Sequence, residues 1–97
     1  MSRNRYVVCY DVREPGRLRR THDTMLGYGD PLQYSVFLCE LSPAERVLLE
    51  CALARVTLAG EDSVLIIDLG PASGVARRRI RTLGRGRIPE RERFTVV

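Results

Sequence analysis

The chain has 97 residues, of which 44% are apolar, and it carries 16 arginines and no lysine against 12 acidic residues, for a net charge of +4. A chain of this length is expected to form one domain, residues 1–97, with a core of its own. Its longest aliphatic run, Val64 to Ile67, is far too short to cross a bilayer, and no apolar stretch near its start is long enough for a signal peptide, so we expect a cytoplasmic protein without a membrane anchor.

The first predicted element is a strand over residues 5–11, "RYVVCYD", which is rich in valine and aromatic residues and is apolar on both faces. The strand ends on Asp11. A carboxylate at the tip of a buried strand is costly unless something nearby compensates it. Pro15 and Gly16 then break the strand, and four arginines follow Asp11 within nine residues.

A helix is predicted from about Gly16 to Leu26, with Gly27 placed to end it. Its apolar stripe comprises Leu18, His22, Met25 and Leu26. His22 is the single histidine of the chain, and its place on this stripe favours a packed, hydrogen-bonded helix residue. Arg17, Arg19 and Arg20 spread over the flanks and back of the same helix.

The helix is followed by "GYGDP", which has the composition of a turn, and then by extended chain from Gln33 to Leu41. Tyr34, Val36 and Leu38 share one face of this segment, and Ser35, Phe37 and Cys39 share the other. The pattern fits either one long strand or two strands joined by a kink.

The second predicted helix has the clearest start in the sequence. Ser42 is suited to cap it, Pro43 suits its first turn, and Glu45 completes a capping box. We expect Gly60 to stop it. Its predicted apolar face comprises Leu48, Leu49, Ala52, Leu53 and Val56.

A further strand, apolar on both faces, is predicted from Ser63 to Leu69, before Gly70 and Pro71. Residues 72–83 have some helical tendency, the stretch that follows is loop-like, and "FTVV" at residues 94–97 predicts a short terminal strand. Residues 77–93 hold eight arginines and two glutamates, a net charge of +6. This basic segment is suited to a phosphate backbone, and the alternative is a solvated tail.

The cysteines and the histidine argue against several kinds of site. Cys9, Cys39 and Cys51 are odd in number, far apart and set among apolar neighbours, which favours core residues over a disulfide framework or a zinc site. With one histidine only, a histidine-based metal site or a catalytic triad is not expected.

The order strand, helix, extended segment, helix, strand predicts an α+β fold, and the ferredoxin-like βαββαβ sandwich fits it best. Its core would span about residues 5–70, with an antiparallel sheet and the terminal strand added. Both helices would cover one sheet face, so the apolar residues of the other face need a partner, most simply a second copy in a homodimer. Asp11 then either closes a turn or approaches its own copy across the two-fold axis, where two carboxylates would hold Mg²⁺.

Four stretches carry a family resemblance in their order and spacing: "YVVCYDV", "RLRRTHDTMLGYG", "QYSVFLCELSPAE" and "EDSVLIIDLG". Over about residues 5–70 the chain closely resembles the CRISPR-associated Cas-two (Cas2) family of small adaptation proteins. The resemblance implies a ferredoxin-like fold and a homodimer in which the C-terminal strand extends to the partner's sheet, a role open to residues 94–97.

The resemblance also implies a site. Asp11 matches the family aspartate that binds a divalent metal between protomers, and some members use it to cut single-stranded RNA or double-stranded DNA. Tyr10 and Phe37 match positions beside that site, and the basic helix is matched by Arg17, Arg19 and Arg20. Where many relatives carry a basic residue before "QYSVF", this chain has Pro31 and Leu32, so that phosphate contact is absent.

Three functions follow as hypotheses. The first is a magnesium-dependent endonuclease built on Asp11, in which the arginines position the backbone. The second is a non-catalytic adaptor that holds DNA and bridges copies of the Cas-one (Cas1) integrase, as the resemblance implies for spacer acquisition. The third is a toxin-like ribonuclease resembling the VapD group, or a small regulatory domain. Further arginine candidates for phosphate contact are Arg77, Arg78 and Arg79.

Overall fold

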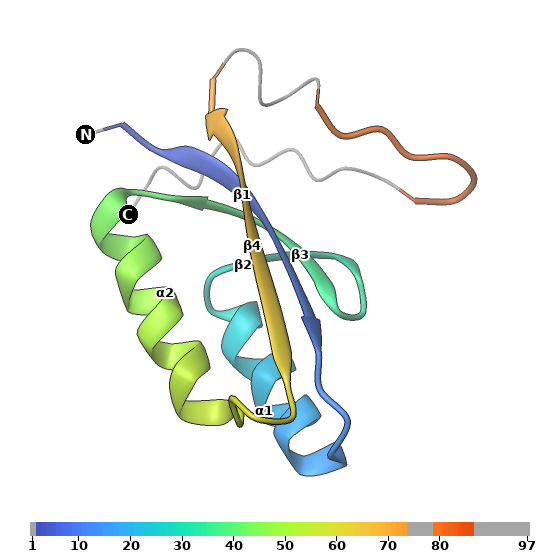
Figure 1. Ribbon diagram of the computed structural model, residues 1–97. Helices are drawn as coiled ribbons and strands as arrows, with labels where there is room; N and C mark the ends of the chain where they lie inside the picture. The colour runs from blue at the N-terminus through green and yellow to red at the C-terminus, as the bar shows by residue number, and fades with distance from the viewer. Residues whose placement is uncertain (1, 74–78, 87–97) are drawn as a thin grey trace.

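The computed structural model describes residues 2–73 and 79–86. Its elements, in chain order, are β1 (Asn4–Asp11), α1 (Pro15–Leu26), β2 (Gly29–Gln33), β3 (Val36–Leu41), α2 (Pro43–Val56) and β4 (Ser63–Pro71) (Figure 1). This βαββαβ order confirms the predicted ferredoxin-like α+β fold. The terminal strand predicted at residues 94–97 lies outside the described residues.

The four strands form one sheet in the order β2-β3-β1-β4, and every neighbouring pair is antiparallel. β1 is therefore an inner strand, hydrogen-bonded along both sides. The register places Tyr6 between Cys39 of β3 and Asp68 of β4, and it places Asp11 opposite Ser63. The strand that ends on the predicted metal ligand is thus paired with a neighbouring strand on each side.

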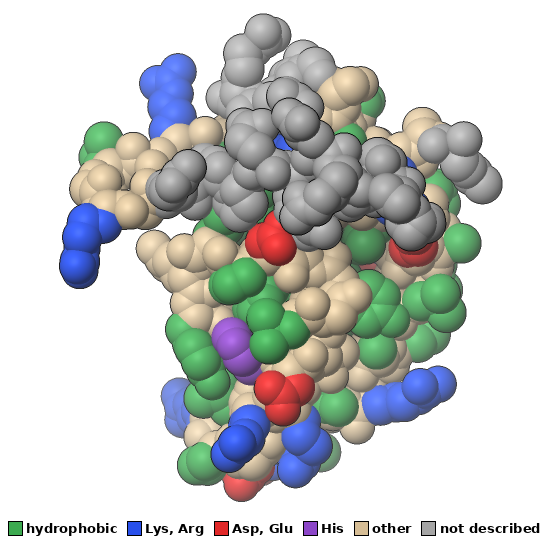
Figure 2. Space-filling view, turned by 180° about the vertical axis from the view of Figure 1, so that it is seen from behind, with side chains coloured by type: hydrophobic (Ala, Val, Ile, Leu, Met, Phe, Trp, Pro, Cys, Tyr) green, Lys and Arg blue, Asp and Glu red, His purple; other side chains and the backbone are tan. Residues whose placement is uncertain are grey.

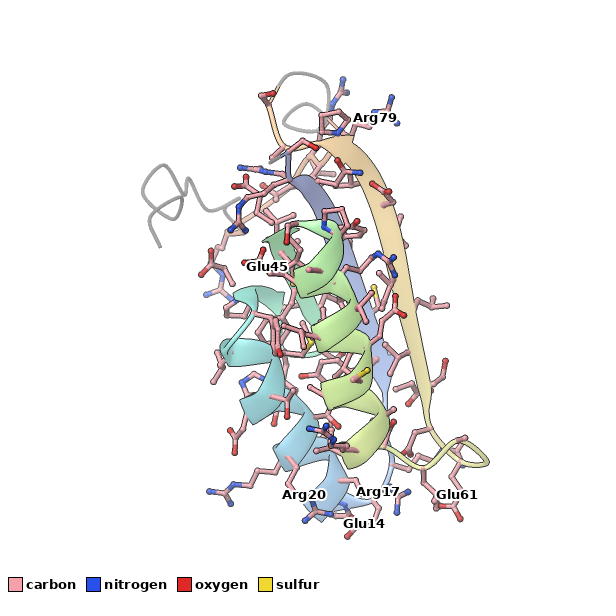
Figure 3. All side chains as sticks on the ribbon, turned by 90° about the vertical axis from the view of Figure 1, so that its left-hand side faces the viewer. Glu14, Arg17, Arg20, Glu45, Glu61 and Arg79 are labelled. Carbon is pink, nitrogen blue, oxygen red and sulfur yellow. The ribbon has the colours of Figure 1, made fainter. Side chains whose placement is uncertain are left out.

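Both helices pack on one face of the sheet, as the side view shows (Figure 3). The core lies between the two layers and comprises Tyr6, Val8, Tyr10, Val12, Met25, Phe37, Cys39, Leu41, Leu49 and Leu53. The opposite face, which we call the helix-free face, carries Val7, Cys9, Val36, Leu65 and Ile67. On it, Leu65 and Ile67 of β4 are 58% and 46% exposed. Apolar side chains therefore occupy both faces of β1 and of β4, as predicted.

Helix α1 begins at Pro15, where the Glu14 carboxylate accepts a hydrogen bond from the Arg17 backbone N–H at 2.7 Å. It ends before Gly27, as predicted. Met25 is fully buried, but Leu26 is 53% exposed, so its predicted place on the buried stripe is wrong. Thr21 is buried instead, because its hydroxyl donates to the Arg17 carbonyl within the helix and leaves no polar atom unpaired.

Helix α2 has the predicted capping box: the Ser42 hydroxyl accepts from the Glu45 N–H, and the Glu45 carboxylate accepts from the Ser42 N–H. The buried residues are Leu49 and Leu53, whereas Leu48 is 59% exposed, contrary to prediction. The helix ends at Val56 rather than at Gly60, because Thr57 leaves the helical conformation and its hydroxyl donates back to the Leu53 carbonyl.

The segment "GYGDP" is only partly a turn. Its last three residues begin β2, which forms a hairpin with β3 through Tyr34 and Ser35, so two strands rather than one continuous strand occupy this region. Pro31 is tolerated because β2 is an edge strand, where a missing N–H costs least. Gly29 is required here, since a Cβ would lie 2.4 Å from the Leu38 carbonyl oxygen.

The cysteines differ from the prediction in two of three positions. Cys39 is buried in the core as expected, but Cys9 is half-buried on the helix-free face and Cys51 is exposed on α2. After β4, residues 72, 73 and 79–83 are not helical, so the helical tendency predicted there is wrong for these positions. None of the helices formed by the described residues is long and apolar enough to cross a membrane.

An ion-pair clasp fixes α1 to the loop between α2 and β4. The Arg17 guanidinium donates from Nε to Asp62 Oδ2 at 2.8 Å, from Nη2 to Asp62 Oδ1 at 3.2 Å and from Nη2 to Glu61 Oε1 at 3.1 Å. The Asp62 side chain is 1% exposed and also accepts from the Leu58 N–H. The Arg17 hydrogen bonds hold the pKa of the Asp62 carboxyl below its ordinary value, and Asp62 in turn raises the pKa of Arg17.

The two adjacent leucines of α2 offer a test of the core. We expect Leu49→Ala to lower the free energy of unfolding by about 2–5 kcal/mol, because it leaves a cavity among fully buried side chains. Leu48→Ala removes a largely exposed side chain and is expected to change it by no more than about 0.5 kcal/mol. Urea unfolding followed by circular dichroism measures both, and equal losses would contradict the assignment of the buried face.

The clasp predicts a pH-dependent stability. A folded-state pKa below the unfolded one stabilises the fold at neutral pH, and this contribution is lost as the pH falls through the folded value. We therefore expect Asp62→Asn to lower the midpoint of thermal unfolding at pH 7, and the gap from wild type to close as the pH falls below 3.8, the ordinary value for aspartate. Glu61→Gln, at an exposed position, is the control and should change the midpoint less. A difference between wild type and Asp62→Asn that stays constant with pH would count against the ion pair.

Candidate functional site

Asp11 is the last residue of β1, and it lies opposite Ser63 of β4. Because side chains alternate along a strand, its carboxylate belongs to the helix-free face, with Val7 and Cys9. The side chain is exposed, and within the described part of the chain it makes no hydrogen bond or ion pair. Water therefore solvates the charge that ends this buried strand.

A free carboxylate suits a hard cation, although one chain supplies few ligands. Among residues 2–73 and 79–86 there is no cluster of three or more His, Cys, Asp or Glu side chains arranged for a metal ion. Mg²⁺ commonly takes only one or two protein carboxylates and fills its remaining positions with water and substrate phosphate. Asp11 fits that requirement, and a second copy of the chain would add a second carboxylate.

The structure places Tyr10 and Phe37 in the core. They are 5% and 0% exposed, and their rings stack with centroids 6.2 Å apart. Burial raises the pKa of Tyr10 to about 12. Tyr10 precedes Asp11 on the same strand, so the two side chains point to opposite faces of the sheet. The structure thus brings the two rings together but does not bring either onto the face of the carboxylate.

Sequence reasoning missed a polar network beneath the β2–β3 turn. The Tyr10 hydroxyl donates to the Tyr34 carbonyl at 2.9 Å, and His22 Nδ1 lies 3.0 Å from that hydroxyl and 3.1 Å from the same carbonyl. A carbonyl oxygen only accepts, so the network is satisfied when Nδ1 carries a proton. The prediction that His22 is a hydrogen-bonded helix residue is confirmed, and its partners are Tyr10 of β1 and Tyr34 of the turn between β2 and β3.

The arginines of α1 divide into two kinds. Arg17 is committed to the clasp with Asp62 and Glu61. Arg19 and Arg20 are exposed; Arg20 lies near Glu14, whereas Arg19 forms no ion pair within the described residues. Figure 3 shows Arg17, Arg20 and Glu14 at the same end of α1. Of the three predicted phosphate contacts, Arg19 and Arg20 are the ones free to meet a ligand.

The basic C-terminal segment is described only in part. Arg77 and Arg78 lie outside the described residues, while Arg79 is exposed and sits at the end of the molecule opposite to Arg17 and Arg20 (Figure 3). A pocket of about 350 Å³ lies between the β2–β3 hairpin and residues 80–86, and Arg81 is one of the residues that line it. Figure 2, which shows the molecule from behind the view of Figure 1, has the cationic side chains in separate groups rather than in one patch.

Comparisons with known proteins agree with this fold. The family model described as "CRISPR associated protein Cas2" matches residues 4–74. A "CRISPR-associated endoribonuclease Cas2" of Geobacter sulfurreducens is 41% identical over 80 residues, covering 82% of this chain and 83% of the relative. A "CRISPR-associated endoribonuclease Cas2 1" of Rhodospirillum rubrum is 43% identical over 70 residues, covering 72% and 69%.

Solved structures agree as well. The crystal structure of Streptococcus pyogenes Cas2 at pH 6.5 superimposes with a TM-score of 0.72 at 34% identity, covering 82% of this chain and 99% of that chain. A hypothetical protein from Thermus thermophilus gives a TM-score of 0.76 at 28% identity, covering 91% and 99%. With the family model matching β1 through β4 in full, this chain belongs to the CRISPR-associated Cas2 family.

Proposed function

We propose that this protein is a metal-dependent endonuclease of CRISPR adaptation, which acts in the cytoplasm as a homodimer. The observation that carries the proposal is the Asp11 carboxylate, exposed and unpaired within the described residues at the end of an inner strand. The relatives from Geobacter sulfurreducens and Rhodospirillum rubrum are named endoribonucleases, which makes single-stranded RNA the first substrate to test and duplex DNA the second.

The dimer is supported by the helix-free face. Leu65 and Ile67 lie exposed side by side with Val7 and Cys9 of β1, so one apolar surface runs across two strands at the sheet's open side. Burying such a surface against a second copy is favourable at roughly 25 cal/mol for each Å² of apolar area. Asp11 is on the same face, so pairing of the faces would bring the two carboxylates toward one axis.

In the proposed cleavage of a phosphodiester, the metal-binding aspartate and the arginines of α1 have separate roles. A bound Mg²⁺ would supply Lewis-acid polarisation of the phosphate and a lowered pKa for a coordinated water. Asp11 from each chain would hold the ion with charged oxygen ligands. Arg19 and Arg20 would position the phosphate backbone by charge, while the Arg17 clasp keeps the start of α1 in place.

An adaptor without catalysis is the second candidate. It is compatible with the described residues of one chain, which hold no group of three or more His, Cys, Asp or Glu side chains arranged for a metal ion. In that role the arginines would hold duplex DNA, and the dimer would bridge copies of the Cas1 integrase. The family match favours both candidates over the VapD-like ribonuclease and over a regulatory domain.

The nuclease proposal is tested by Asp11→Asn, which keeps the side chain's size and removes its charge. We expect magnesium-dependent cleavage of labelled single-stranded RNA or duplex DNA to fall about 100-fold or more, because charge stabilisation at the phosphate is lost. Size-exclusion chromatography is the control that the dimer persists. Full-rate cleavage by the variant would remove Asp11 from the chemistry, and no cleavage by either protein, with binding intact, would establish the adaptor.

The arginine assignment is tested by the salt dependence of duplex DNA binding. The slope of log affinity against log salt is expected to fall by about one for each phosphate contact removed, so Arg19→Gln and Arg20→Gln should each reduce it. Arg17→Gln serves as the comparison: we expect it to lower the thermal midpoint and to leave the slope unchanged. The reverse pattern would show that the clasp, not the exposed pair, meets the backbone.

A further inference from the structure

An exposed aromatic ring is held rigidly at the β2–β3 turn. The Tyr34 ring is stacked on His22, with centroids 4.3 Å apart and planes only 6° from parallel. His22 also meets the buried Phe37 ring edge-on at 5.3 Å. The three rings contact one another in series and form a ladder from the buried Phe37 through His22 to Tyr34 at the surface. Tyr34 is 58% exposed.

The ladder is fixed by hydrogen bonds that do not involve the Tyr34 hydroxyl. The Tyr34 carbonyl accepts from the Tyr10 hydroxyl and lies 3.1 Å from His22 Nδ1, so the backbone of the turn and the imidazole hold each other in place. One face of the Tyr34 ring is covered by the imidazole. Its exposed area therefore belongs largely to the other face and the ring edge, which are preorganised for a flat ligand.

An arginine side chain lies next to the stack on α1. Arg19 precedes His22 by three residues on α1, a spacing that makes the two side chains neighbours on the helix surface. Within the described residues Arg19 has no ion-pair partner. The stack also lies at the end of the sheet where β1 finishes, because the Tyr10 N–H donates to the Ser35 carbonyl at 3.1 Å. Asp11 is the next residue along β1.

We propose that the Tyr34–His22 stack is a platform for one unpaired base of a single-stranded nucleic acid, with Arg19 contacting an adjoining phosphate. An aromatic face offers every base a stacking partner without reading its sequence, and an arginine beside it holds the backbone. A base inside a duplex is already stacked on its neighbours, so the platform selects single strands. The proposal rests on the proposed nucleic-acid function and assigns it a substrate form.

The chain offers a direct probe, because it contains no tryptophan. Tyr34→Trp places the chain's single tryptophan on the platform, where its emission can be excited selectively, and keeps an aromatic face. We expect its emission to be quenched by a single-stranded oligonucleotide of RNA or of DNA, and much less by a blunt duplex. The titrations are made in EDTA, so that binding is measured without metal or cleavage.

Removal of the ring gives the energetic test. We expect Tyr34→Leu to weaken binding of a single-stranded oligonucleotide by about 5-fold to 100-fold, the effect of one lost base–aromatic stack, without changing the salt slope. Arg19→Gln should instead lower the magnitude of the salt slope by about 0.7, the value for one phosphate contact on a single strand. Leu48→Ala is the matched control, since Leu48 is 59% exposed on α2, and it should change neither quantity. Fluorescence anisotropy measures all three, and circular dichroism confirms their folding.

Several outcomes overturn the platform. Equal affinity of wild type and Tyr34→Leu for single strands would show that the Tyr34 ring binds no base and only covers the hydrogen-bonded network of Tyr10 and His22. Weakening that is equal for single strands and duplex, or that accompanies loss of the dimer in sedimentation, would assign the ring to another contact. Failure of the wild type to bind single strands would also overturn it, while magnesium-dependent cutting of duplex DNA that is lost in Asp11→Asn would leave the proposed function standing.

Discussion

The pleat of β1 is the constraint on which the rest of this structure depends. β1 is paired on both sides, so its register is fixed, and a shift by one residue would move every side chain to the wrong face. This constraint sends Tyr10 into the helical layer and Asp11 to the opposite face. One dipeptide therefore connects a buried aromatic network with an exposed carboxylate. The division of the molecule into a packed side and an open side follows from it.

The arginines show how a uniform residue type can serve different purposes. Arg17 is paired bidentately with a carboxylate that is almost fully buried, and such a pair is costly to break because it leaves a charge uncompensated. Arg5 is similarly enclosed, with its Nε 3.0 Å from Glu40. Arg19, two positions from Arg17 on α1, has no comparable partner in the described part of the chain. A count of charges treats these side chains alike, whereas their ion pairs decide which of them are available to a ligand.

Much of the fold could be predicted from the sequence because its signals are local. The capping box at Ser42 and Glu45, the stop at Gly27 and the run of valine and aromatic residues in β1 all act within a few residues, and the elements that they predict are all observed. The errors arose where tertiary structure decided. Pro31 reads as a turn residue until β2 is known to be an edge, and Leu48 reads as core until the crossing of α2 over the sheet selects Leu49 instead.

The candidate site was predictable to a smaller extent. Asp11 could be singled out because a charged residue interrupts an apolar strand. The contacts among Tyr10, His22 and Tyr34 join residues separated by up to 24 positions, and no local pattern announces them. Likewise, Arg17 carries the same signal as its neighbours until the loop bearing Asp62 is placed beside it.

The position of β4 has a consequence for the chain on its own. β4 is the edge of the sheet formed by the described residues, and it carries Leu65 and Ile67 exposed on one face. An unprotected edge with apolar side chains is a template for uncontrolled strand pairing and aggregation. Association with a specific partner would cover this edge, so the proposed assembly would protect the protein against aggregation as well as serve its activity. By mass action, such association would also make the apparent thermal stability depend on protein concentration.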